Sequence, residues 1–300
     1  RPPMERSSYM LPVAVGCSYN RCTFCTLFKH LRYRPLPIEQ VEQELKRVSA
    51  AGGNPVQIFL GDGNAFGMET DHLLHILELI HRYFPGCRMV NMDATVTNIS
   101  QKSDEELRLL YDQGVRRLYL GIESGLDDVL SFTKKDHNLQ QAYCQIERMK
   151  NAGMIFNAHI MTGIAGAGRG TENAQQTALF FNRTQPERII NFSLFLNRRA
   201  PLFRDYQAGR FTPASELENL MEDRLLVSLL QVPGLHYDGM HDMLKVRVRG
   251  TLPQDREKML KKFDAFCDAN RQNLWLEEDA VPEEKEESAE QVMDDCLSSS

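Results

Sequence analysis

Three cysteines lie within nine residues near the start of this 300-residue chain, in the segment GCSYNRCTFCT. Cys17, Cys22 and Cys25 follow an apolar run that is typical of a strand. Thiolates are soft ligands, and a tight group of them favours zinc, copper(I) or an iron–sulfur cluster. A structural zinc site usually needs four protein ligands, and no fourth ligand is obvious nearby. Because an iron–sulfur cluster takes one thiolate per iron, three thiolates predict an open iron, although zinc or metal-free cysteines also fit the spacing.

The elements that must position these thiols are short apolar strands alternating with amphipathic helices. The predicted strands are residues 9–16, 56–60, 88–93, 117–121, 155–161 and 188–194. Such alternation predicts parallel βαβ units with right-handed crossovers. An open doubly wound sheet and a partial or full (β/α) barrel both fit the pattern, and in both the site lies at the carboxyl ends of the strands.

Polar residues follow several of these strands, so we expect them on the same rim as the cysteines. Asp62 lies in GDGN and can bind an ammonium or hydroxyl group, or simply form an Asp-Gly turn. Glu123 in GIESG can accept hydrogen bonds from a ribose diol, or cap the next helix. Asp93 occupies a similar place, Lys135 can reach a carboxylate, and His159 is more typical of a satisfied barrel histidine.

The composition is that of an ordinary globular protein, except that the last 25 residues are strongly acidic. Residues 276–300 hold ten acidic side chains and one lysine, so the net charge of −6 becomes about +3 for the first 275 residues. A nearly neutral body argues against bulk nucleic-acid binding, and the acidic end is typical of disorder. We find no apolar run long enough for a membrane span. Seven cysteines without secretory features predict a reducing, cytoplasmic location.

The cysteine segment GCSYNRCTFC resembles the cluster loop of the radical S-adenosylmethionine (radical SAM) superfamily. The resemblance covers residues 9–196 and is closest to the branch shared by coproporphyrinogen-oxidase-like and methylthiotransferase-like members. GDGNAF and GIESG also resemble one subgroup of that branch. One departure is that four residues separate Cys17 from Cys22, where the superfamily usually has three.

The resemblance implies a ligand set for two cofactors, a 4Fe-4S cluster and S-adenosyl-L-methionine (SAM). Cys17, Cys22 and Cys25 would bind three irons, and SAM would chelate the fourth. Phe24 would pack by the adenine. The other SAM-contacting positions that the resemblance implies are Gly61, Asp62, Gly63, Asp93, Glu123 and Lys135. No catalytic side chain is assigned.

The fold implied is an α/β partial (β/α)6 TIM-type barrel with a C-terminal helical and mixed extension. Its parts would be a barrel of residues 1–196, an extension of residues 197–275 covering the barrel mouth, and the disordered acidic tail, residues 276–300. The implied function is an oxygen-sensitive enzyme that cleaves SAM to a 5′-deoxyadenosyl radical, which takes hydrogen from an unidentified small-molecule substrate. A low-potential donor such as flavodoxin or ferredoxin would supply the electron. Alternatives are an oxygen-independent porphyrinogen oxidase-like enzyme, a non-enzymatic haem-binding carrier and a zinc-binding structural protein.

Overall fold

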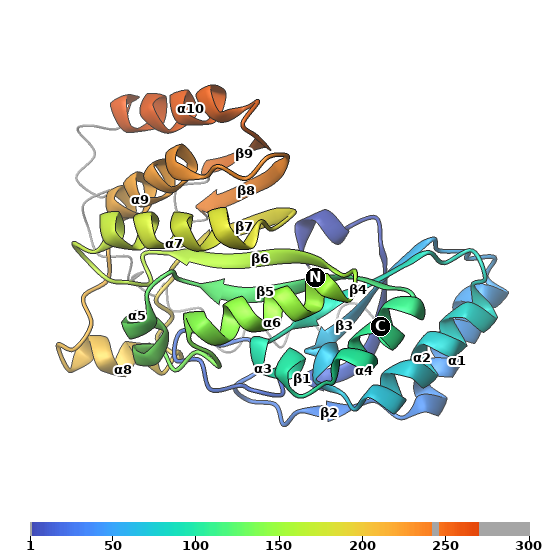
Figure 1. The fold of residues 1–300 in the computed structure, drawn as a ribbon. Coiled ribbons are helices and arrows are strands. Elements are labelled where there is room, and N and C mark those ends of the chain that lie inside the picture. The colour runs from blue at the N-terminus through green and yellow to red at the C-terminus, as the bar shows by residue number, and fades with distance from the viewer. Residues whose placement is uncertain (1, 242–245, 270–300) are drawn as a thin grey trace, which may run out of the picture.

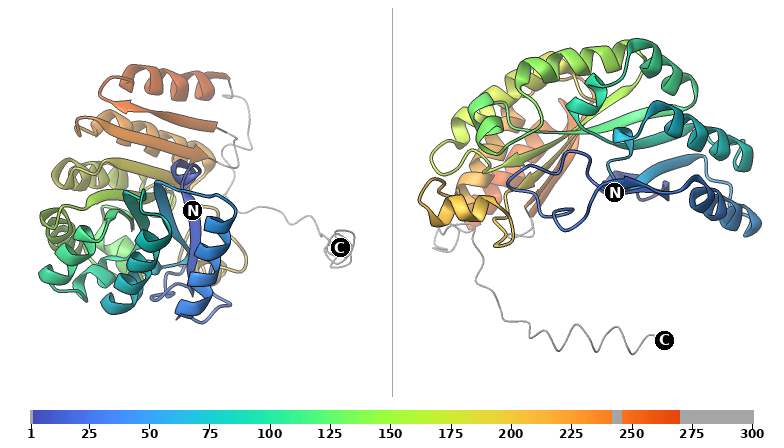
Figure 2. Two further views of the ribbon diagram at one scale, coloured as in Figure 1. Left: turned by 90° about the vertical axis from the view of Figure 1, so that its right-hand side faces the viewer. Right: turned by 90° about the horizontal axis from the view of Figure 1, so that it is seen from below.

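The computed structural model describes residues 2–241 and 246–269. Within them, one sheet of nine strands has the order β2-β1-β3-β4-β5-β6-β7-β8-β9. The strands are β1 (Tyr9–Gly16), β2 (Arg34–Pro35), β3 (Gln57–Gly63), β4 (Met89–Ala94), β5 (Val115–Glu123), β6 (Ile155–Thr162), β7 (Arg188–Ser193), β8 (Leu235–His241) and β9 (Val246–Leu252). The sheet is curved, and most of the helices lie on its convex face, whereas α8 lies apart from them (Figures 1 and 2).

The helices alternate with the strands along most of the chain. They are α1 (Ile38–Ala50), α2 (Thr70–Tyr83), α3 (Val96–Ser100), α4 (Asp104–Asp112), α5 (Asp127–Phe132), α6 (Leu139–Asn151), α7 (Gly170–Thr184), α8 (Leu202–Gln207), α9 (Glu216–Leu229) and α10 (Arg256–Ala269), with the short 3-10 helices η1 (Pro3–Glu5) and η2 (Ala65–Gly67). The spacing of Ser103 and Glu106 in the sequence predicts a capping box at the start of α4. The structure confirms it, since the Ser103 hydroxyl accepts a hydrogen bond of 3.1 Å from the Glu106 N–H. Among the described residues, each helix is too short or too polar to cross a lipid bilayer.

The predicted fold class, an α/β partial barrel, is confirmed. All six predicted strands are present, as β1 and β3 to β7, and consecutive members pair in parallel. Beyond them, β8 pairs in parallel with β7, and β9 pairs antiparallel with β8. The C-terminal part therefore continues the sheet with two more strands. The division into a barrel of residues 1–196 and an extension over its mouth stays a prediction.

The sequence offers His236, Tyr237, His241 and Asp242 as candidates for substrate contact, but favours a polar surface turn for them. Strand β8 corrects that interpretation. Aspartate and glycine are uncommon in strands, so the Asp-Gly pair in LHYDGMH suggests a turn and not a strand. In the structure Tyr237 is buried and its hydroxyl donates a hydrogen bond to Asp223 of α9. Tertiary contacts therefore outweigh the local preference of these residues. Asp242 and the acidic residues 276–300 lie outside the described residues.

The N-terminal segment packs inside the concave face of the sheet, next to the amino ends of the strands. Met4 contacts an apolar cluster of Phe59, Tyr119 and Ile190. The buried carboxylate of Glu5 accepts a hydrogen bond of 2.6 Å from the Tyr119 hydroxyl, and others from Gln57 and Asn91. These contacts fill the concave side of the sheet near the amino ends of the strands, away from their carboxyl ends.

Candidate functional site

A cavity of about 410 Å³ lies at the carboxyl ends of the strands, where the sequence predicted a site. Its lining includes Cys17, Cys22, Phe24, Cys25, Gly63, Asp93, Glu123, Lys135 and His159. Gly61 and Asp62 are not part of this lining. Asp62 is exposed, with a φ of 64°, and Gly61 packs against the side chain of Met10. The structure thus brings the three thiols together with most of the predicted cofactor-binding residues.

The cysteine loop is held by hydrogen bonds to the segment after α5 and to α8. The Thr23 N–H donates to the Thr133 carbonyl at 2.9 Å, and the Tyr19 hydroxyl donates to the Lys134 carbonyl at 2.8 Å. On its other side, the Leu202 N–H of α8 donates to the Thr23 carbonyl at 2.9 Å. Backbone groups far apart in the sequence therefore fix the loop that carries the thiols.

The additional residue between Cys17 and Cys22 is accommodated at Asn20. Its φ of 48° lies in the left-handed region, which asparagine adopts more readily than most residues. The Asn20 side-chain amide donates a 2.7 Å hydrogen bond to the Phe28 carbonyl, and Lys29 donates to the Asn20 carbonyl at 2.8 Å. The longer loop is therefore a defined turn with its own hydrogen bonds.

The GDGN motif supports the base of the cysteine loop. A Cβ added at Gly63 would lie 2.5 Å from the Gly16 carbonyl oxygen, so only glycine allows β1 and β3 to approach this closely. The Asn64 N–H donates to that same carbonyl at 3.0 Å. The Asn64 side chain donates to Asn98 at 2.6 Å, and Asn98 donates to the hydroxyl of Ser18 at 3.2 Å. This network beside Cys17 was not foreseen from the sequence.

A buried ion pair lines the same cavity as the thiols. Glu123 ends β5 with a φ of 67°, and its carboxylate lies 3.1 Å from the Lys135 ammonium. Lys135 also lies 3.6 Å from Asp136, a residue that sequence reasoning missed. Burial opposes ionisation of Asp136, but the hydrogen bond with His137 and the charge of Lys135 hold its pKa well below the usual range. The break between α5 and α6 was the only sequence signal for this residue.

The thiols themselves are in a partly apolar environment. Burial raises the pKa of Cys22 to about 11, although the charge of Lys135 opposes the shift, and burial also raises the pKa of Cys25. Metals bind the thiolate, so a metal must displace these protons. Within residues 2–241 and 246–269, no three histidine, cysteine or acidic side chains converge on a single-ion site. A four-iron cluster takes one thiolate per iron, so its ligands need only face a common cavity, as these three do.

Asp93 and His159 face each other at the inner end of the cavity. His159 Nε2 lies 4.0 Å from Asp93 Oδ1, and the imidazole stacks on Phe192 with ring centroids 6.1 Å apart. Burial raises the pKa of Asp93 to about 6 and lowers the pKa of His159 to about 4. At physiological pH the imidazole is therefore neutral and the Asp93 carboxyl group mostly ionised, so this pair adds a negative charge to the cavity.

Behind Glu123, a buried polar network joins the GIESG turn to helix α9. The Ser124 hydroxyl donates to Asn173 of α7 at 2.5 Å, and the Asn173 amide donates to Glu222 of α9 at 2.6 Å. Glu222 also accepts a 3.0 Å hydrogen bond from the Gly163 N–H, at the end of β6. One carboxyl group therefore links the turns after β5 and β6. Sequence reasoning missed Glu222 because acidic residues in helices usually face solvent.

Glu222 predicts a pH dependence of stability. Burial raises the pKa of its carboxyl group to about 8, whereas the unfolded chain ionises near the ordinary value of about 4.3. The folded state then holds a proton that the unfolded state lacks, so stability falls as pH rises between these values. We expect Glu222→Gln to remove about 1 kcal/mol of the loss between pH 7 and pH 9. Urea denaturation at both pH values measures it, and an unchanged pH slope in the variant would contradict it.

Gly125 predicts a large steric effect at the same turn. A Cβ added there would lie 2.3 Å from backbone atoms of Gln176 and Thr177 in α7. Because backbone cannot move aside as a side chain can, Gly125→Ala should destabilise the protein by about 3 kcal/mol or more. The matched control is Gly86→Ala, where the nearest atom is a side-chain oxygen at 3.5 Å. Thermal unfolding of the two variants tests this, and similar melting temperatures would contradict it.

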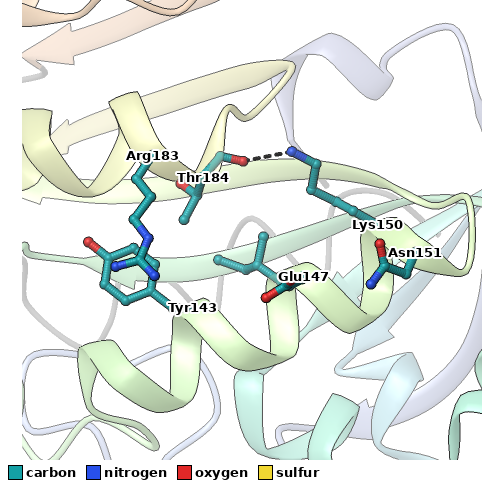
Figure 3. Close-up of a pocket in the computed structure, with 7 residues that line it drawn as sticks. Tyr143, Glu147, Lys150, Asn151, Arg183 and Thr184 are labelled. Atoms are coloured by element: carbon teal, nitrogen blue, oxygen red, sulfur yellow. Dashed lines mark hydrogen bonds between the residues drawn. The ribbon is translucent and has the colours of Figure 1, made fainter.

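Another cavity of about 410 Å³ lies on the outer surface between α6 and α7 (Figure 3). Its cations already have partners. The Arg183 guanidinium lies 4.3 Å from the centre of the Tyr143 ring, and the Lys150 ammonium donates to the Thr184 carbonyl at 2.9 Å. It contains no thiol. This cavity therefore lacks the soft ligands that a cluster needs.

Comparison with known proteins identifies the family. The profile of the radical SAM superfamily matches residues 11–173, which is more than half of the chain. The chain belongs to the radical SAM superfamily. Members of this superfamily use a 4Fe-4S cluster and SAM, so three thiols beside an acidic rim are the expected donor set.

Individual relatives of the superfamily are distant. The haem chaperone HemW of Bacillus subtilis is 25% identical over 223 residues, which cover 72% of this chain and 58% of HemW. The coproporphyrinogen III oxidase HemN of Escherichia coli, a solved radical SAM enzyme, has a TM-score of 0.52 at 13% identity and covers 87% of this chain and 52% of HemN. Elp3 of Methanocaldococcus infernus has a TM-score of 0.55 at 14% identity, over 88% of this chain and 63% of that protein. The chain thus spans only part of each relative's length, and the two structures establish a shared fold.

Proposed function

We propose that this chain is a radical SAM enzyme that cleaves SAM and uses the resulting 5′-deoxyadenosyl radical to take hydrogen from a small-molecule substrate. The observation that carries this is the single cavity shared by Cys17, Cys22 and Cys25 with the Glu123–Lys135 pair. A cluster in that cavity, when bound and reduced, supplies the electron that breaks a carbon–sulfur bond of SAM. The protein's own contribution is to bind and orient the cofactors and to exclude water.

The residues of the cavity suit separate parts of SAM. The three thiolates would hold three irons and leave the fourth for the amino acid end of SAM. Glu123 presents a carboxylate for a ribose or ammonium group, and Lys135 an ammonium for a carboxylate. Phe24 packs among Leu194, Leu196 and other apolar side chains at the cavity wall, which is a suitable surface for an adenine ring. Asp93 lines the cavity, so it would contact SAM directly. Gly61 and Asp62 lie outside the lining, so they would contact SAM only after a rearrangement of the cavity wall.

The rest of the cavity limits the chemical character of the substrate. Beside Asp93 and His159, the lining is mostly apolar, with Met161 and Phe192. An electron donor such as flavodoxin or ferredoxin would approach near Cys25, where Leu27 is 72% exposed and the basic stretch Lys29 to Arg34 begins. We further propose that α8, which hydrogen-bonds to the cysteine loop, belongs to the cover of the barrel mouth.

The deciding experiment is anaerobic reconstitution with iron and sulfide, followed by reduction with dithionite in the presence of SAM. We expect about four irons per chain and the formation of 5′-deoxyadenosine. An intact cluster that yields no 5′-deoxyadenosine would overturn the enzymatic proposal. Stoichiometric zinc without sulfide would overturn the cluster itself.

A haem-binding carrier on the same scaffold is the second candidate, because the similarity to the HemW haem chaperone extends over 72% of this chain. Haem titration of the reconstituted protein separates the two. A saturable Soret shift without SAM cleavage favours the carrier, and SAM cleavage without a Soret shift favours the enzyme. A porphyrinogen oxidase-like activity would appear as loss of a porphyrinogen carboxyl group under the same anaerobic conditions.

A further inference from the structure

A cavity of about 520 Å³ lies between the N-terminal segment and strands β7, β8 and β9. We call it the arginine pocket. Its charged or titratable lining residues are Arg6, Arg188, His236, Asp238, Arg247 and Arg249. Arg188 begins β7, whereas Phe192, four residues later on the same face of β7, lines the cysteine cavity. At about 3.3 Å per residue, these two lining residues are therefore about 13 Å apart along the strand.

Sheet register brings these cations together. In β8, His236 lies opposite Arg188 of β7, and Asp238 lies opposite Arg249 of β9. Side chains alternate between the two faces of a strand, so residues 188, 236, 238, 247 and 249 share one face. Neighbouring strands are about 4.8 Å apart, which leaves the arginine side chains within reach of one ligand.

Within the part of the chain that the structure describes, most of this positive charge has no direct counter-charge. Both carboxylate oxygens of Asp238 accept hydrogen bonds from Arg247. Its Nε donates to Asp238 Oδ1 at 2.8 Å, and its Nη2 donates to Asp238 Oδ2. Across the described residues, the guanidinium groups of Arg6, Arg188 and Arg249 have neither a hydrogen bond nor an ion pair. Three cations from three separate segments thus face one cavity without partners.

Glu5, the acidic neighbour of Arg6 in the sequence, makes its direct contacts elsewhere. Its carboxylate accepts hydrogen bonds from Tyr119, Gln57 and Asn91, and within the described residues it forms no ion pair with Arg6, Arg188 or Arg249. These bonds lower the pKa of Glu5 against the opposing effect of its burial. The carboxylate is therefore committed to holding the N-terminal segment in place.

Convergent like charges repel, and a protein tolerates them where a ligand of opposite charge binds. Guanidinium groups present forked N–H donors that match the oxygen atoms of phosphates and carboxylates. We propose that the arginine pocket binds a small polyanion with two or more phosphate or carboxylate groups. Volumes of about 300–1,000 Å³ are usual for small-molecule sites, so a ligand of that size fits the pocket.

This site is distinct from the proposed SAM site. Met4, packed on Phe59, Tyr119 and Ile190, lines the arginine pocket, while Pro2 lines the cysteine cavity. The N-terminal segment therefore lies between the two cavities. A polyanion on Arg6 and Arg188 would fasten this segment to the sheet without reaching the thiols, so its binding does not depend on SAM cleavage.

Isothermal titration calorimetry of the cluster-loaded full chain tests the proposal, with inorganic pyrophosphate and tricarballylate as separate probes. Cluster absorbance is followed to confirm that the probe does not extract iron. We expect saturable binding of at least one probe, weaker at higher salt. The double variant Arg188→Gln/Arg249→Gln should lower its affinity about tenfold or more. The arm that binds more tightly shows whether the natural groups are phosphates or carboxylates.

The matched control is Arg34→Gln/Arg108→Gln, which removes two exposed arginines from β2 and α4. This control should bind the probe as the unchanged protein does. Arg249→Gln alone serves as a second variant, since its exposed side chain is not needed for folding. The proposal is overturned if neither probe binds, or if the pocket variants and the control lose affinity equally.

Discussion

Replacing Cys22 by alanine should lower 5′-deoxyadenosine formation by more than about 1000-fold, because a cluster that loses one of three thiolates no longer presents an open iron correctly. The charge of Lys135 acts to lower the pKa of Cys22, and this thiol lines the cavity with Cys17 and Cys25. The measurements are iron and sulfide content after anaerobic reconstitution and 5′-deoxyadenosine by chromatography.

The matched control is Cys144→Ala, which removes an exposed thiol from the outer helix α6. It should retain iron, sulfide and SAM cleavage. If Cys22→Ala keeps a full cluster and normal cleavage, the three-thiol assignment is wrong. If the control loses the cluster as well, the effect comes from general thiol chemistry and not from the loop.

Replacing Glu123 by glutamine should weaken both the fold and SAM binding. The Lys135 side chain is 7% exposed and would keep only Asp136, at 3.6 Å, as a counter-charge. Breaking a buried pair usually costs about 3–5 kcal/mol, and the remaining aspartate should reduce this to about 2 kcal/mol. We also expect the KM for SAM to rise about tenfold or more, because a charge-assisted hydrogen bond is lost.

An ion pair near the amino ends of the strands provides the comparison. Arg117 and Glu187 lie 2.9 Å apart with side chains 23% and 34% exposed, so water screens them. Glu187→Gln should therefore cost less than about 1 kcal/mol and leave the KM for SAM unchanged. Urea unfolding and initial-rate kinetics on both variants provide the test. Equal losses of stability would show that the Glu123–Lys135 pair has no special role.

The sequence predicted the parts of this protein that depend on local pattern. Apolar runs and helix periodicity located β1 and β3 to β7, and the Ser103 and Glu106 spacing located the start of α4. Because parallel strands place their carboxyl ends on one rim, it also followed that Cys17, Asp93 and Glu123 would meet. The structure confirms this convergence at one cavity.

Strand β8 and the partners of the site depended on the tertiary structure. LHYDGMH forms a strand because Tyr237 is buried against α9, and no local preference indicates that. The GDGN motif resembled a ligand-binding turn, yet Gly63 and Asn64 hold the backbone of Gly16 beneath the cysteine loop. Asp62 of the same motif is exposed outside the cavity lining.

The buried polar network around Glu222 and the arginine pocket also depend on groups that are distant in the sequence. Glu222 reaches the turn of Ser124 through Asn173, and Arg6, Arg188 and Arg249 meet on one sheet face. Residue types and spacing determine strands, helices and the thiols that can bind iron, because these depend on neighbouring residues. Burial, counter-charges and close backbone contacts are set by chain segments that meet only after folding, so the structure alone decides them.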